Sequence, residues 1–169
     1  MELSTREFWA LIHGLILGGV FLVAFAGALA GLWSMRPELV TEQGIRERIR
    51  RLSIGMTTMA TVAWLTVVTG TWIVYPWYRE DVSSSARSRL LADPDTADWH
   101  EFAMEWKEHI AWIAPTLATV AAFIVLYYQR DLLRNQTARR LAIALLVASF
   151  TIAAIAGILG ALITKNESV

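Results

Sequence analysis

The chain of 169 residues contains no cysteine. This absence excludes disulfide bonds, a covalently attached c-type haem, a cysteine-ligated iron–sulfur cluster and a thiol nucleophile. Charged residues are scarce at 18%, and 15 basic residues are balanced by 15 acidic ones. Because nucleic-acid binding needs a basic surface, we predict no nucleic-acid partner. The sequence also lacks a phosphate-binding glycine loop, a repeated Glu-x-x-His motif and a pair of broken spans, so phosphate-loop, di-iron and transporter functions are not indicated.

Apolar sequence, by contrast, is abundant. Hydrophobic residues make up 56% of the chain and gather in four runs, at about 8–33, 54–77, 109–128 and 141–164. Each run is close to the roughly 20 residues that cross a bilayer as a helix. The runs are apolar on every face, which disfavours a barrel of alternating strands. We therefore predict an all-α protein with one domain, residues 1–169, folded as an integral membrane four-helix up-down bundle with an outer loop over about 78–108.

The first run has an alternative interpretation as a cleaved signal peptide. The sequence Ala24-Phe25-Ala26 resembles a signal-peptidase site after an apolar stretch. The length of the run and the mixed charge before it favour a retained helix instead. Ser4 and Glu7 have the spacing of a capping box, which predicts that the helix starts there.

The distribution of arginine predicts the orientation. Segments 34–53 and 129–140 hold nine of the 15 basic residues and only four of the 15 acidic ones. Basic enrichment beside spans marks the cytoplasmic side, so we expect both termini and the outer loop to be extracytoplasmic in a multi-pass protein of the inner (plasma) membrane. In the first segment Ile45, Ile49 and Leu52 recur at helical spacing among arginines. This pattern predicts a helix lying on the membrane surface in contact with anionic lipid, although the same charges could serve topology alone.

Two histidines lie in apolar runs that point the same way through the membrane. His13 stands 23 positions before Arg36, and His109 stands 21 before Arg130. At about 1.5 Å per residue, their depths differ by only about 3 Å. A buried imidazole is costly unless it has a partner, and two imidazoles at one depth could be the axial ligands of a haem iron. Alternatively, each ring could donate a hydrogen bond to a carbonyl or lie at the water interface.

Several neighbours at the same level fit a large flat cofactor. Gly14 would let a flat ring approach the helix, although small residues at this spacing also serve helix packing. Arg79 could pair with a haem propionate. Glu105 precedes His109 by one turn, where its carboxylate could accept the outer N–H of a ligating imidazole and orient it, unless it is only a solvated charge.

A quinone pocket is a second use of the same region. Tyr75, Arg79, His100 and Glu105 could line it, whereas Tyr75 could equally belong to the aromatic belt at the membrane interface. His100 is then either a bystander or a neighbour of the propionate or quinone. No catalytic residue is predicted in either case.

In architecture, four spans with His13 on the first and His109 on the third resemble the small four-helix membrane cytochromes b of respiratory complexes. The resemblance implies one b-type haem near the extracytoplasmic face, held by these two histidines. It also implies a non-catalytic electron-relay subunit of an oxidoreductase complex. The expected partners are other membrane subunits, lipid and a soluble extracytoplasmic cytochrome docked on the acidic outer loop. The alternatives are a cofactor-free scaffold or assembly subunit and a quinone-binding membrane anchor.

Overall fold

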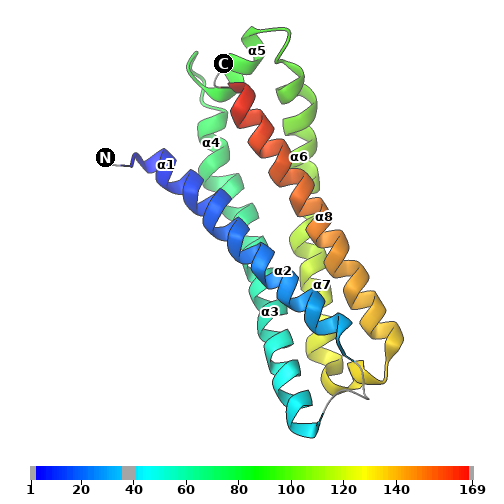
Figure 1. Ribbon diagram of the computed structural model, residues 1–169. Helices are drawn as coiled ribbons and strands as arrows, with labels where there is room; N and C mark the ends of the chain where they lie inside the picture. The colour runs from blue at the N-terminus through cyan, green and yellow to red at the C-terminus, as the bar shows by residue number, and fades with distance from the viewer. Residues whose placement is uncertain (1–2, 36–40, 168–169) are drawn as a thin grey trace.

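The fold consists of four long helical rods, described over residues 3–35 and 41–167 of a computed structural model (Figure 1). Every regular element in these residues is helical. The first rod contains α1 (Thr5–Ala10), a π-helical segment η1 (Leu11–Ile16) and α2 (Leu17–Trp33). The second contains α3 (Glu42–Thr69), a π-helical segment η3 (Gly70–Val74) and α4 (Tyr75–Tyr78).

The second half of the chain supplies the other two rods. The short helix α5 (Ala86–Ala92) lies between the second and third rods. The third rod contains a π-helical segment η4 (Trp99–Met104), α6 (Glu105–Ile110), α7 (Ile113–Tyr128) and the 3₁₀ segment η5 (Gln129–Leu133). The fourth rod is α8 (Gln136–Glu167). The outer region predicted as a loop over 78–108 is therefore largely helical.

All four rods are long and apolar enough to cross a membrane, and they extend over Thr5–Trp33, Glu42–Tyr78, Trp99–Leu133 and Gln136–Glu167. The prediction of an all-helical, multi-pass membrane protein is confirmed at this level. The second and third rods exceed the roughly 20 residues that the hydrocarbon needs, so they project beyond it. Ser4 caps the first rod as predicted, because its hydroxyl accepts from the Glu7 backbone N–H while the Glu7 carboxylate accepts from the Ser4 N–H.

The predicted surface helix at 44–52 is wrong. These residues form the first turns of the continuous helix α3, and Ile49 and Leu52 are buried in the bundle. Their apolar stripe packs against other helices, so the segment is part of the bundle and does not lie flat on the membrane surface. Arg36, one of the two reference positions for histidine depth, lies outside the described residues.

The third rod is interrupted at Ala111 and Trp112, between α6 and α7. Pro115 follows four residues after Ala111 and is fully buried. A proline lacks the N–H that would bond the carbonyl four residues earlier, and its ring crowds that carbonyl. The interruption therefore follows from Pro115.

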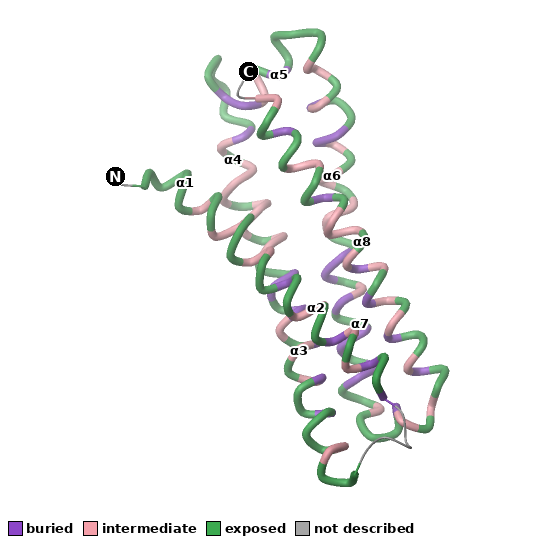
Figure 2. Tube along the Cα trace, viewed as in Figure 1, coloured by how far each residue is buried: buried purple, intermediate pink, exposed green. Residues whose placement is uncertain are grey.

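Buried residues form two separate cores (Figure 2). The larger core is built from α2, α3, α7, η5 and α8, with Leu32, Met56, Met59, Val125 and Leu146 among its most enclosed members. The smaller core lies at the other end of α8, where Ile163 meets Tyr78, Leu90, Ala103 and Met104. The level between the two cores contains few buried residues.

Candidate functional site

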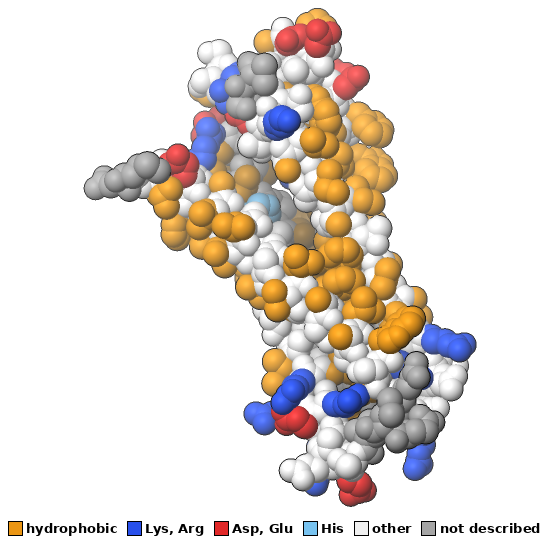
Figure 3. Space-filling view, in the orientation of Figure 1, with side chains coloured by type: hydrophobic (Ala, Val, Ile, Leu, Met, Phe, Trp, Pro, Cys, Tyr) orange, Lys and Arg blue, Asp and Glu red, His pale blue; other side chains and the backbone are white. Residues whose placement is uncertain are grey.

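Three segments, each from a different rod, lie at the level between the two cores, and none of them contains a buried residue. They are η1 (Leu11–Ile16), η3 (Gly70–Val74) and α6 (Glu105–Ile110). In α8 the buried residues Ala156 and Ile163 bracket the same level. Figure 1 shows α1 leaning away from the rest of the bundle here, and Figure 3 shows this face hollowed beside the N-terminal helix, with histidine atoms at the edge of the hollow. The core is thus loosest where η1 faces the other helices.

His13 lies in η1 and points at the junction of α3 and η3. Its Nδ1 is 3.0 Å from the Thr69 hydroxyl oxygen, and that hydroxyl donates its own hydrogen to the Leu65 carbonyl at 2.8 Å. Because the hydroxyl has only one hydrogen to give, it accepts from His13, so Nδ1 carries the proton. The His13 Nε2 atom then presents a lone pair, and nothing within residues 3–35 and 41–167 forms a hydrogen bond with it.

Gly70 makes room for this ring. A Cβ atom at position 70 would lie 3.6 Å from His13 Nε2 and only 2.9 Å from Cε1, and the second distance is shorter than real Cβ contacts. The glycine therefore allows the imidazole to lie directly against the backbone of η3. The backbone carbonyl of Thr66 is a further hydrogen-bond acceptor for the ring.

Lys107 of α6 faces the same space. Its ammonium acts electrostatically on His13, and its Nζ and Cε atoms would lie 3.2 and 3.3 Å from a Cβ atom at Gly160 of α8. The Glu108 carboxylate acts on the ammonium, yet no described residue accepts a hydrogen bond from Nζ. The site thus combines an imidazole lone pair with a cationic donor, and neither has a hydrogen-bonding partner among the described residues.

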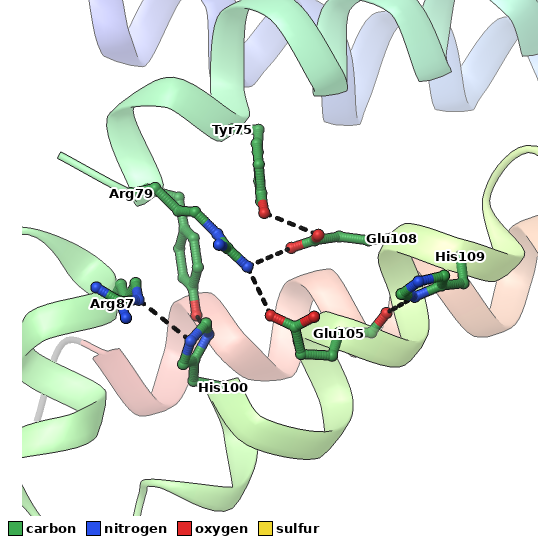
Figure 4. Close-up of polar contacts among 8 residues, drawn as sticks. Tyr75, Arg79, Arg87, His100, Glu105, Glu108 and His109 are labelled. Atoms are coloured by element: carbon green, nitrogen blue, oxygen red, sulfur yellow. Dashed lines mark hydrogen bonds and ion pairs between the residues drawn. The ribbon is translucent and has the colours of Figure 1, made fainter.

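An outer polar cluster stands above this pair, where α4 faces α6 (Figure 4). The Tyr75 hydroxyl donates to Glu108 Oε2 at 2.7 Å, and Arg79 Nη2 lies 2.6 Å from Glu105 Oε1 and 3.7 Å from Glu108 Oε1. The Arg79 guanidinium also lies 5.0 Å from the centre of the Tyr75 ring, which is within cation–π range. Glu108 joins this cluster to the ammonium of Lys107.

His100 is the buried histidine, with 6% of its surface exposed. Arg87 Nε donates to its Nε2 at 3.2 Å, so Nδ1 must carry the proton and donate to the Tyr78 hydroxyl at 2.9 Å (Figure 4). Both ring nitrogens are engaged by the protein. His100 therefore ties α4, α5 and η4 together and has no nitrogen left for a ligand.

His109 is exposed, and its Nδ1 donates to the Glu105 backbone carbonyl at 2.6 Å (Figure 4). It shares the outward face of its rod with Phe102, Trp106 and Ile113, which are all exposed. At about 100° per residue, His109 lies about 200° around the helix from Lys107, the residue that faces His13.

The structure brings together part of the predicted site. Tyr75, Arg79 and Glu105 meet in the outer polar cluster, as a shared pocket requires. The Glu105 carboxylate binds Arg79 and does not orient the His109 ring, which takes the backbone carbonyl instead. Gly14 is exposed, with open space where a side chain would stand. His13 and His109 occupy different faces and do not converge on a common point within the chain.

The sequence interpretation missed the residues that complete the site. Thr69, Gly70 and Lys107 were not among the predicted site residues. A signal for Lys107 was present, because Ala103, Lys107 and Ala114 share one helical face on which the other two positions are buried. A charge on that face was the clue to a polar interior.

Comparison of the chain with protein-family models, curated proteins and solved structures gives no significant match. The functional argument therefore depends on the site geometry.

Proposed function

We propose that this chain is a quinone-binding membrane subunit of an electron-transfer complex, with the redox centres on other membrane subunits or on a soluble extracytoplasmic cytochrome. The quinone head would lie between His13 and Lys107, near the predicted extracytoplasmic end of an up-down bundle whose termini are both on that side. One observation carries the proposal: an imidazole nitrogen and an ammonium, neither with a hydrogen-bond partner within residues 3–35 and 41–167, face one poorly packed level of an otherwise apolar bundle.

The two side chains suit the two ends of a quinone ring. Lys107 Nζ–H would donate to one ring oxygen, and His13 Nε2 would accept from the hydroxyl of the reduced form. A neutral ring brings no further charge into the membrane, where an added ion would be costly. Gly14 on η1 and Gly157 on α8 have open space in place of side chains, which suits a flat ring.

Access to the site is from the lipid. Leu15 and Ile16 of the first rod and Ile158 of the fourth rod are exposed and apolar, and they are close in sequence to His13 and Gly160. An isoprenoid tail could follow this surface outward, as expected for a ligand that enters from a bilayer.

The outer polar cluster would supply the polar side of the pocket. Glu108 Oε1 is buried and lacks a hydrogen-bond partner among the described residues, while Oε2 accepts from Tyr75. The carboxylate acts electrostatically on Lys107 and lies within reach of Arg79, which faces the outer surface. Glu108 thus links the ammonium to water-accessible groups, a position from which it could exchange protons with the site.

Titration of the purified protein with ubiquinone-1 tests the proposal, with quenching of intrinsic tryptophan fluorescence as the readout. Lys107→Met keeps the length of the side chain but removes the donor, and His13→Leu removes the acceptor. We expect each substitution to weaken binding about tenfold or more, since each removes a hydrogen bond to a desolvated ligand.

The matched controls are His109→Leu and Lys165→Met, which replace the same residue types away from the site. Unchanged affinity in the controls and weakened affinity in the site variants supports the proposal. Equal effects in all four variants, or no saturable binding by the unsubstituted protein, would contradict it and favour the scaffold function.

A haem relay is the second candidate, because His13 has the geometry of a metal-ligating histidine. Metal-bound imidazoles usually donate their other ring N–H to a neighbouring oxygen, and Thr69 accepts such a bond from Nδ1. Lys107 or Arg79 could pair with a propionate. His109 does not face His13 within the chain, so the second axial ligand predicted from the sequence would have to reach the iron by another arrangement.

The absorption spectrum of the dithionite-reduced protein distinguishes the two candidates. A sharp α band that disappears in both His13→Leu and His109→Leu would support the bis-histidine relay. A band lost only in His13→Leu would assign one ligand to this chain and the other elsewhere. A colourless protein that binds ubiquinone-1 supports the quinone site.

A further inference from the structure

A second feature of the molecule is a long groove between α2 and α3, whose residues are separate from those of the polar site. The groove has a volume of about 690 Å³ and is lined on the α2 side by Gly19, Val23, Gly27 and Gly31. Leu52, Gly55 and Thr58 line the α3 side, and Arg48 and Arg51 stand at one end. We propose that this groove binds one anionic phospholipid, with an acyl chain along the glycines and the phosphate on the two arginines.

The glycines create the groove because they remove side chains from the contact between the helices. A Cβ atom at Gly19 or Gly27 would meet nothing within 4 Å, whereas one at Gly31 would meet Leu52 at 3.4 Å. The groove is therefore open along most of α2 and closes near the arginines. Val20, Val23 and Ile54 are exposed around it, so its walls are apolar.

The dimensions match one leaflet of a membrane. From Gly19 to Gly31 the helix rises about 18 Å at 1.5 Å per residue. Half of a hydrocarbon core of roughly 30 Å is about 15 Å. An acyl chain that starts at the arginine end would thus reach the bilayer centre before the groove ends.

The charged end selects the headgroup. Arg48 Nη1 donates to the Ser34 carbonyl at 2.9 Å and lies 3.4 Å from the Ser34 hydroxyl, which holds the guanidinium at the end of α2. Arg51 Nε donates to Glu47 at 2.8 Å. Each guanidinium has five N–H donors, so both keep donors free for a phosphate, although Glu47 competes for Arg51.

The location agrees with where such lipids are found. Figure 3 shows Lys and Arg side chains gathered at the lower end of the molecule, below a broad hydrophobic band. This is the end that the charge distribution assigns to the cytoplasm, and anionic lipids are enriched in that leaflet. A zwitterionic headgroup would add a cation beside two arginines, which disfavours it.

Native mass spectrometry of the delipidated full-length protein tests the proposal, with phosphatidylglycerol and phosphatidylcholine of identical chains as probes. We expect one bound phosphatidylglycerol and a preference of about tenfold over phosphatidylcholine. The double variant R48A/R51A should lose the preference. Gly27→Leu adds a side chain to the groove at a position where a Cβ atom has nothing within 4 Å, and it should lose binding of both lipids.

Arg50 and Ala26 provide matched controls, since neither lines the groove. Arg50→Ala removes one arginine from the same helix, and Ala26→Leu adds the same side chain beside Gly27. Both should bind like the unsubstituted protein. The proposal is overturned if the two lipids bind equally, or if Arg50→Ala changes binding as much as Arg51→Ala does. It is also overturned if the unsubstituted protein is a dimer that Gly27→Leu separates, because a second copy of the chain would then occupy the groove. Arg51 is exposed, so its variant reports on binding even if Gly27→Leu does not fold.

Discussion

The three histidines of the chain differ in the hydrogen bonds that their ring nitrogens make with the protein. His13 and His100 both carry the proton on Nδ1, from which they donate hydrogen bonds to the Thr69 and Tyr78 hydroxyls. Arg87 engages Nε2 of His100, while Nε2 of His13 has no hydrogen bond within the described part of the chain. His109 uses its ring only to bond its own helix. The hydrogen-bond partners, rather than depth in the membrane, therefore decide which histidine can bind a ligand.

The close contact between Gly70 and His13 gives the first prediction. Gly70→Ala should lower the stability by about 1–3 kcal/mol, because the new methyl group would displace the imidazole. Thermal unfolding in detergent, followed by tryptophan fluorescence, measures the change. Gly14→Ala is the control, since open space surrounds that position and the loss of a helical glycine costs nothing there. Equal midpoints for the two variants would show that the ring is free to move.

Substitution should destabilise the protein at His100 but have little effect at His109. His100→Ala leaves Tyr78 and Arg87 without their partner and opens a cavity, so we expect a loss of about 2–3 kcal/mol. His109→Ala removes an exposed ring, and a change within about 0.5 kcal/mol is expected. The same unfolding measurement compares them. A large loss in His109→Ala would reveal a partner for that ring which the single chain does not contain.

Residue types in the sequence were enough to predict part of the site. The rest could not be predicted, because it depends on the direction in which each side chain leaves its helix. Tyr75, Arg79 and Glu105 were recognised because aromatic and charged residues at a span end stand out in an apolar sequence. The pairing of His13 with His109 was inferred from depth alone. Rotation about the helix axis is not fixed by depth, and π-helical turns in η1, η3 and η4 shift it further from a regular period.

At the scale of whole helices, polar contacts join the rods where apolar packing alone would let them slide. Ser149 of α8 is fully buried and donates to the Ala114 carbonyl of α7 at 2.8 Å. Ala114 lies in the first turn of α7, which begins at Ile113 directly after the interruption of the third rod. The bond therefore fixes α8 against the rod just after its interruption.

Ser149→Ala should cost about 1 kcal/mol, because it removes an interhelical hydrogen bond in the apolar interior. Thr151→Ala is the matched control, since the Thr151 hydroxyl bonds only Val147 of its own helix and is exposed. Unfolding midpoints in detergent compare the two. The assignment fails if Thr151→Ala is as destabilising as Ser149→Ala.

The number of spanning helices could be predicted from the sequence, because a run of about 20 apolar residues has few other stable states in a membrane. The ends of the rods could not. Hydropathy marks where a helix leaves the lipid, while helix length depends on capping and packing, as at Thr41, whose hydroxyl accepts from the Gly44 N–H and starts α3 well before its apolar part.

At the scale of the whole molecule, the polar site and the lipid groove lie at different levels of the bundle. The polar site lies between the two cores, and the arginines of the groove lie at the end opposite the short helix α5. Figure 1 shows both chain ends in the upper half of the view, on the side of α5. This arrangement fits the predicted orientation, in which the arginine-rich end faces the cytoplasm.

Cysteine accessibility tests that orientation, and the natural absence of cysteine keeps the background low. Single cysteines replace Ser83, in the exposed outer region, and Gln43, at the exposed start of α3. A membrane-impermeant thiol reagent should label Ser83→Cys in intact cells and Gln43→Cys only after permeabilisation. The reverse labelling pattern would show that the protein has the opposite orientation in the membrane.

Photoaffinity labelling with an azido-quinone, followed by peptide mass mapping, tests the central claim most directly. The account predicts that the label attaches to peptides from η1, α6 or the neighbouring part of α8 around Gly160, and that Lys107→Met and His13→Leu reduce it. Labelling confined to other peptides, or left unchanged in both variants, would contradict a quinone site between His13 and Lys107.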